Sequence, residues 1–192
     1  MCPHLLQNSK FFRFLSACDD ELAEQVRRAG CPYCGGRLHR ADYPRKPRGG
    51  PQELESETVR RRSFCCEREG CRRRTTPGSL RFLGRRVYCS VAVVLIPAMQ
   101  QGVRPVRCGI LQERLGISAR TLRRWRRWWQ TIFARSGFWR GVRGLLRRPV
   151  AAGELPLALM DSFAGTMRSR LLALLRLLVP ITVGSPDPVL AP

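Results

Sequence analysis

The chain has 192 residues, of which 44% are hydrophobic, which is enough for a buried core and excludes a wholly disordered chain. Its formal net charge at pH 7 is +21, from 35 basic and 14 acidic residues, far more than a neutral cytosolic enzyme needs. Because phosphate is the natural counter-charge for such a surface, the composition favours nucleic acid as the partner.

Positive charge is concentrated in the second half of the chain. Lys10 and Lys46 are the only lysines, a preference for arginine that GC-rich codon usage would also produce. Codon usage does not explain the distribution of sign, however. Ten of the 14 acidic residues lie at or before Glu69, whereas residues 72–148 contain 19 arginines and one acid, Glu113. The excess positive charge therefore belongs to this second segment.

Residues 1–30 predict an N-terminal helix. Apolar residues recur along residues 9–29, and we expect the helix to start near Asp19 and to stop at Gly30. The first residues lack the continuous apolar run and the small-residue cleavage site that are typical of a secretory signal. We therefore expect a reducing, cytoplasmic compartment.

Two pairs of cysteines predict a metal site in residues 31–80. Cys31 and Cys34 are separated by two residues and followed by two glycines, and Cys66 and Cys71 form a second, wider pair. Paired thiols in a reducing compartment favour a metal over a disulfide. Four thiolates close a tetrahedral site and leave no position for a catalytic water, so we expect a structural Zn²⁺ in a zinc-ribbon-like module.

The second pair leaves alternatives open. Alternation along a strand in residues 58–66 places Phe64 and Cys66 on one face, which favours Cys66 as the ligand, with Cys65 as the alternative. The insert of residues 35–65 is longer than the usual ~15–20. Ordinary buried cysteines or a redox Cys-x-x-Cys would also fit the composition, and His39 is not expected among the ligands.

Residues 81–135 predict a three-helix bundle with a helix-turn-helix. The apolar run 87–99 contains Pro97 and is shorter than the ~20 residues of a membrane span, so we expect a core helix and no membrane association. Gly116 fits the turn between the next two helices, and Ser118 is the expected N-cap of the second. The inner face would consist of Leu111, Leu115, Ile117, Leu122 and Trp125.

The second of these helices carries the residues predicted to contact DNA. They are Ser118, Arg120, Thr121, Arg123, Arg124 and Arg127. Arginine at the start of a recognition helix reads guanine in the major groove, while other arginines hold phosphates. The alternative is an arginine-rich, solvated helix in an unrelated helical hairpin.

Residues 136–192 give weak signals. Glycine, arginine and proline interrupt every pattern except one possible helix that ends before Pro180, and the tail after Gly184 is expected to be disordered. The apolar face of residues 171–179 predicts either a buried core helix or a dimer contact. The fold class is thus mainly α with a small β zinc ribbon.

The order of CPYCGG, RRSFCCEREGCRRR, the apolar helix and LQERLGISARTLRRWRRWW resembles the N-terminal region of bacterial insertion-sequence transposases that pair a zinc ribbon with a helix-turn-helix. The resemblance covers about residues 30–135. It implies a bacterial, nucleoid-associated protein of mobile-element type that binds double-stranded DNA, with a separate transposase or a second copy of the chain as a further partner.

The catalytic domain of such transposases has no counterpart in this chain. The only acids after the helix-turn-helix are Glu154, Asp161 and Asp187, and the segment that holds them is too short for a complete nuclease fold. We therefore expect no catalysis by this chain alone. The alternatives are an RNA-binding zinc protein and a truncated, inactive transposase remnant.

Overall fold

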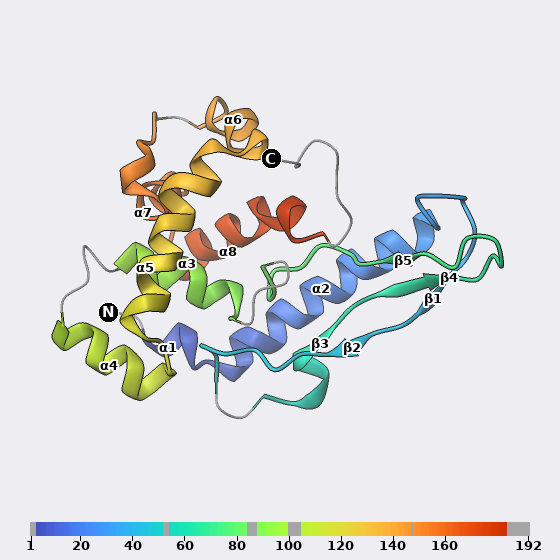
Figure 1. The fold of residues 1–192 in the computed structure, drawn as a ribbon, viewed down its shortest axis with the longest axis horizontal. Helices are drawn as coiled ribbons and strands as arrows, with labels where there is room; N and C mark the ends of the chain where they lie inside the picture. Colours follow the sequence, from blue (N-terminus) through green and yellow to red (C-terminus); the bar gives the residue numbers. More distant parts are fainter. Residues whose placement is uncertain (1–2, 52–53, 84–87, 100–104, 147, 184–192) are drawn as a thin grey trace.

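The computed structural model of the chain, drawn in Figure 1, describes residues 3–51, 54–83, 88–99, 105–146 and 148–183. The molecule is elongated, with most helices at one end and a small three-stranded antiparallel sheet at the other. The prediction of a mainly helical chain with a small β module is confirmed. No helix in these ranges combines the length and the apolar character needed to cross a membrane.

Helix α2 connects the two ends of the molecule (Figure 1). After the short helix α1 (Pro3–Leu6), α2 runs from Ser9 to Ala29, so it begins well before the predicted start at Asp19. The side chain of Asn8 caps it by accepting a hydrogen bond from the amide of Phe11 at 2.9 Å. Gly30, with φ of +80°, ends the helix where it was expected to end.

Of the two small sheets, the three-stranded one lies at the other end and the two-stranded one lies nearer the middle of the molecule (Figure 1). The predicted strand over residues 58–66 is interrupted, since it consists of the 3-10 helix η1 and two short strands in different sheets. The three-stranded sheet has the order β1 (Leu38–Arg40), β4 (Phe64–Cys66), β5 (Arg74–Thr75). The two-stranded sheet pairs β2 (Tyr43–Pro44) with β3 (Arg60–Arg61), which directly follows η1 (Ser56–Val59). Both β2 and β3 lie within the long insert between the cysteine pairs.

The helical end is built around α3 (Ser90–Met99), the predicted core helix, in which every residue from Ser90 to Ala98 is buried. After it come α4 (Pro105–Leu115), α5 (Ala119–Arg127), the π-helical turn η2 (Trp128–Phe133) and α6 (Gly137–Arg143), of which α5 and η2 contact α3. The chain continues through η3 (Ala152–Glu154), α7 (Leu157–Asp161), α8 (Met167–Leu177) and η4 (Val179–Thr182).

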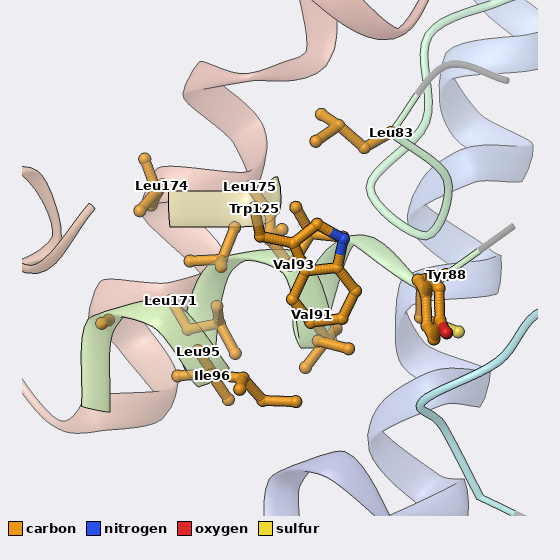
Figure 2. Packing of buried hydrophobic residues seen from close by; sticks show 14 of the residues in the cluster. Leu83, Tyr88, Val91, Val93, Leu95, Ile96, Trp125, Leu171, Leu174 and Leu175 are labelled. Atoms are coloured by element: carbon orange, nitrogen blue, oxygen red, sulfur yellow. The ribbon is translucent and has the colours of Figure 1, made fainter. Parts of the chain in front are cut away.

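The C-terminal segment contains more helix than its sequence predicted. Three leucines of α8, Leu171, Leu174 and Leu175, are buried against α3 (Figure 2), as the core-helix interpretation of residues 171–179 requires. Trp125 of α5 also lies against α3 and meets Tyr88 edge to face, with ring centroids 4.8 Å apart (Figure 2). Residues 184–192, the predicted disordered tail, lie outside the described residues.

Pro97 lies inside α3 and removes one hydrogen bond of that buried helix. A helical amide normally donates to the carbonyl four residues earlier, and proline has no amide hydrogen, so the buried carbonyl of Val93 loses its helical donor. The indole Nε1 of Trp129, in η2, donates to that carbonyl at 2.9 Å. A buried tryptophan thus satisfies the carbonyl that a proline leaves open, and joins η2 to α3.

Buried arginines join the sheets to the helices. Asp19 of α2 is 1% exposed and accepts hydrogen bonds from the Ser79 hydroxyl at 2.5 Å and from Nε of Arg81 at 2.8 Å. Arg81 is equally buried and also donates to the carbonyls of Thr58 and Arg60, beside β3. The Asp19–Arg81 ion pair therefore joins three parts of the chain at one point: helix α2, strand β3, and the segment that follows β5.

A second buried arginine holds the C-terminal end of the described chain. Arg61 of β3 donates to the carbonyl of Pro77 at 2.5 Å and to that of Thr182 in η4 at 3.0 Å. Burial lowers the pKa of Arg61. Charge counting along the sequence cannot distinguish these structural arginines from the surface ones.

The hydrogen bond between Trp129 and Val93 yields a double-mutant test. We expect Trp129→Phe to reduce the free energy of unfolding by about 1–3 kcal/mol, because the Val93 carbonyl stays buried without a donor. In the Pro97→Ala background the restored amide supplies that donor, so the same substitution should cost less. Urea unfolding of the four proteins measures both values, and an equal cost in the two backgrounds would contradict the assignment.

The Asp19–Arg81 pair predicts a large effect of a single carboxylate. Asp19→Ala should reduce the free energy of unfolding by about 3–5 kcal/mol, since it leaves Arg81 buried without its counter-charge. Asp161→Ala is the matched control, because Asp161 is 49% exposed and pairs with Arg170 at the surface, where such pairs contribute about 1 kcal/mol or less. Similar losses in the two variants, measured by denaturant unfolding, would refute a buried pair.

Candidate functional site

The structure brings the four predicted cysteines together. The Sγ atoms of Cys31, Cys34, Cys66 and Cys71 all lie within 4.8 Å of one another. Sγ of Cys31 is 3.7 Å from that of Cys71, and Sγ of Cys34 is 3.5 Å from that of Cys66. A disulfide needs ~2.05 Å, whereas sulfurs at the corners of a tetrahedron with ~2.3 Å metal–sulfur bonds lie ~3.8 Å apart. The cluster therefore has the size of a metal–thiolate centre.

The first pair sits on a tight turn that its glycines make possible. The amides of Cys34 and Gly35 both donate to the carbonyl of Cys31, at 3.3 and 2.8 Å, and Gly35 has a φ of +69°. A Cβ atom on Gly36 would lie 3.1 Å from Sγ of Cys66. The glycines thus let the backbone turn and let the sulfur of Cys66, from the second pair, approach it.

The second pair uses the same turn with a displaced ligand. The amides of Cys71 and Arg72 both donate to the carbonyl of Arg68, at 2.9 and 3.0 Å, which repeats the pattern of Cys31–Gly35. Arg72 has a φ of +43°, so it is left-handed like Gly35, the equivalent residue of the first turn. The first sulfur of this pair comes from Cys66, two residues before Arg68, so the spacing is wider although the turn is equivalent.

Two other candidate ligands lie outside the cluster. Cys65 is half-buried on the opposite face of β4, with its Sγ 3.5 Å from the carbonyl of Arg72, while Phe64 and Cys66 are buried as the predicted alternation requires. Nε2 of His39 contacts a carboxylate oxygen of Glu67 at 2.9 Å. Among the described residues, the only metal-sized group of cysteine, histidine and carboxylate side chains is the cysteine quartet.

The thiols of the quartet differ in acidity. Burial raises the pKa of the Cys31 thiol, but hydrogen bonds from the amides of Tyr33 and Cys34, together with those to the thiols of Cys71 and Cys34, outweigh it and lower the pKa to about 7. Burial raises the pKa of Cys66 to about 12. A cation that binds all four sulfurs as thiolates must displace these protons, so its binding is coupled to pH.

The turn before α5 follows the predicted pattern. Gly116 has a φ of +64° and its amide donates to the carbonyl of Gln112 at 3.0 Å, which ends α4 in a left-handed cap. Ile117 is fully buried next to this turn. The hydroxyl of Ser118 accepts a hydrogen bond from the amide of Thr121 at 3.3 Å, so Ser118 is the N-cap of α5.

Helix α5 has one buried and one arginine-covered face. Leu122 and Trp125 are buried in the core. The predicted DNA-contacting arginines are all exposed, and they are Arg120, Arg123, Arg124 and Arg127. The two remaining residues of the predicted set, Ser118 and Thr121, are half-buried, and their hydroxyl oxygens lie 3.2 Å apart in the cap. The arginines therefore form the accessible part of the set.

The late acidic residues make local contacts. Glu154 accepts a hydrogen bond from the amide of Ala151 at 3.4 Å, and Asp161 pairs with Arg170 at 3.1 Å. Asp187 lies outside the described residues.

Comparison of the chain with protein-family models, curated proteins and solved structures gave no match.

Adjacent cysteines provide a matched test of the metal centre. We expect Cys66→Ser to abolish or greatly weaken metal binding, because it removes one of four converging sulfurs, whereas Cys65→Ser should leave one metal per chain. Elemental analysis of the purified variants, together with their thermal unfolding, measures this difference. The reverse result, with metal lost only in Cys65→Ser, would contradict the ligand set.

Proposed function

We propose that this protein is a DNA-binding protein of mobile-element type, in which a zinc centre has a structural role and α5 is the recognition helix of a helix-turn-helix formed with α4. The single observation that carries the proposal is the exposed arginine face of α5 on a helix whose other face is anchored in the core.

Zinc is the metal that this donor set favours. Four sulfurs at tetrahedral spacing suit Zn²⁺, and soft thiolate ligands discriminate against calcium and magnesium. Four protein ligands complete its coordination, so the ion would hold the two turns together and perform no chemistry. The small sheets around it would then depend on the metal for their stability.

The geometry of α5 suits a duplex groove. Arg120, Arg123, Arg124 and Arg127 follow a spacing of three and four residues and therefore share one face of the helix. The sequence between Glu113 and Glu154 contains no acidic residue, so nothing on α5 or α6 neutralises these charges. Arginines near the start of such a helix read guanine edges, and those further along hold phosphates.

The mobile-element assignment rests on the resemblance in the order of the cysteine turns, the apolar helix and the arginine-rich helix. It implies a binding role without strand cleavage by this chain, together with a separate transposase or a second copy as partner. RNA binding by the same surface is the alternative outcome of the test.

The test is selection of a preferred duplex from a random pool, followed by titrations at several salt concentrations. We expect Arg120→Ala to reduce discrimination between the preferred and a mismatched duplex by about 1–3 kcal/mol. Arg13→Ala removes the same charge from α2, where Arg13 pairs with Glu55, and should leave discrimination unchanged. Equal effects of both substitutions would contradict a recognition helix.

The same titrations distinguish DNA from RNA. The logarithm of the affinity should fall linearly with that of the salt concentration, with a slope of about −0.9 for each phosphate contacted in B-DNA. Preference for a structured RNA over every selected duplex at fixed salt would replace the DNA assignment with the RNA one.

A further inference from the structure

A second basic surface lies at the sheet end of the molecule. Arg72, Arg73 and Arg74 directly follow the fourth cysteine and are all exposed. The guanidinium of Arg73 lies 4.6 Å from the centroid of the Tyr33 ring, and Tyr33 itself is 45% exposed. We call these four residues the ribbon tip. Stacking on tyrosine holds an arginine in place while leaving its donors accessible.

The two cysteine turns hold the ribbon tip in position. Arg72 takes its left-handed backbone from the second cysteine turn, and Tyr33 lies between the two cysteines of the first. Glu67 and Glu69 are the acidic residues on the second turn, and Glu67 already contacts His39. Arginines therefore outnumber the acids at this end, and the tip presents positive charge.

The middle of the molecule has a different charge balance. Near β3, the guanidinium of Arg62 contacts the carboxylates of Asp20, Asp42 and Glu57. On α2, Arg13 pairs with Glu55 at 3.5 Å. Carboxylates thus neutralise these arginines between the two basic ends.

Figure 1 places α5 and the three-stranded sheet at opposite ends of the longest axis, with α2 and β3 between them. Helix α2 alone spans roughly 30 Å at 1.5 Å per residue. The carboxylates of Asp20, Glu55 and Glu57 are 47%, 67% and 69% exposed between the two ends, so a single straight duplex laid along the molecule would face negative as well as positive groups. We propose that the ribbon tip is a second, sequence-independent contact for nucleic-acid phosphates, so that one chain bridges two separate nucleic-acid segments. The bridging proposal rests on the proposed function of α5.

The experiment is a capture assay with the full chain. A biotinylated preferred duplex is immobilised, protein is added, and retention of a second, fluorescent duplex is measured. Wild-type protein should retain the second duplex. In the tip variant, Arg72, Arg73 and Arg74 are changed to alanine. This variant should still bind the first duplex, but the amount of second duplex that it retains should fall at least about tenfold. Lysine at the same three positions keeps the charge and should preserve capture.

Further variants and mixtures of variants distinguish the results that would contradict the bridging proposal from those that would contradict the proposed function. Retention of the second duplex by the tip variant at the wild-type level would overturn the proposal, as would binding of the first duplex by wild-type protein without any capture. An α5 variant with Arg120, Arg123, Arg124 and Arg127 changed to alanine cannot bridge alone. If mixing it with the tip variant restores capture, a dimer bridges and a single chain does not. Failure of wild-type protein to bind even the first duplex would instead refute the proposed function. Equal metal content in all variants establishes that the cysteine turns are intact.

Discussion

The convergence of four sulfurs from two turns is the constraint on which the sheet end depends. Its own apolar cluster contains only Ala23, Cys31, Leu38, Phe64 and Cys66 as buried members, and two of those are cysteines of the quartet. So small a core contributes little stability by itself. With a metal bound, the quartet would fix the two turns, and these in turn determine the register of β1 with β4 and the direction of the arginines that follow Cys71.

Arginine has two different roles in this chain. Arg61, Arg62 and Arg81 are buried and hold the sheets, α2 and η4 together through carbonyls and carboxylates. Four arginines of α5, Arg120, Arg123, Arg124 and Arg127, and those of the ribbon tip are exposed and available to a polyanion. The planar guanidinium suits both roles, because its five donors can satisfy several buried acceptors or clamp a phosphate. The net charge of the chain therefore overestimates the number of arginines that are available to bind a polyanion.

Local patterns in the sequence predicted the parts of the structure that depend on neighbouring residues. The spacing of Cys31 and Cys34, the cap at Ser118 and the turn at Gly116 are of this kind, since each depends on a few consecutive residues. The partners of Asp19 and of the Val93 carbonyl lie 62 and 36 residues away, so no local pattern reveals them. Helices α7 and α8 were underestimated for the same reason, because burial against α3 stabilises them where helix propensity is weak.

X-ray absorption at the zinc edge, recorded on the full chain purified with zinc, tests the central claim most directly. Four thiolates predict a first coordination shell of four sulfurs at ~2.3 Å, with no nitrogen or oxygen ligand. A shell with nitrogen or oxygen ligands, or protein that retains no zinc, would contradict a closed cysteine centre and, with it, the idea that a metal organises this end of the molecule.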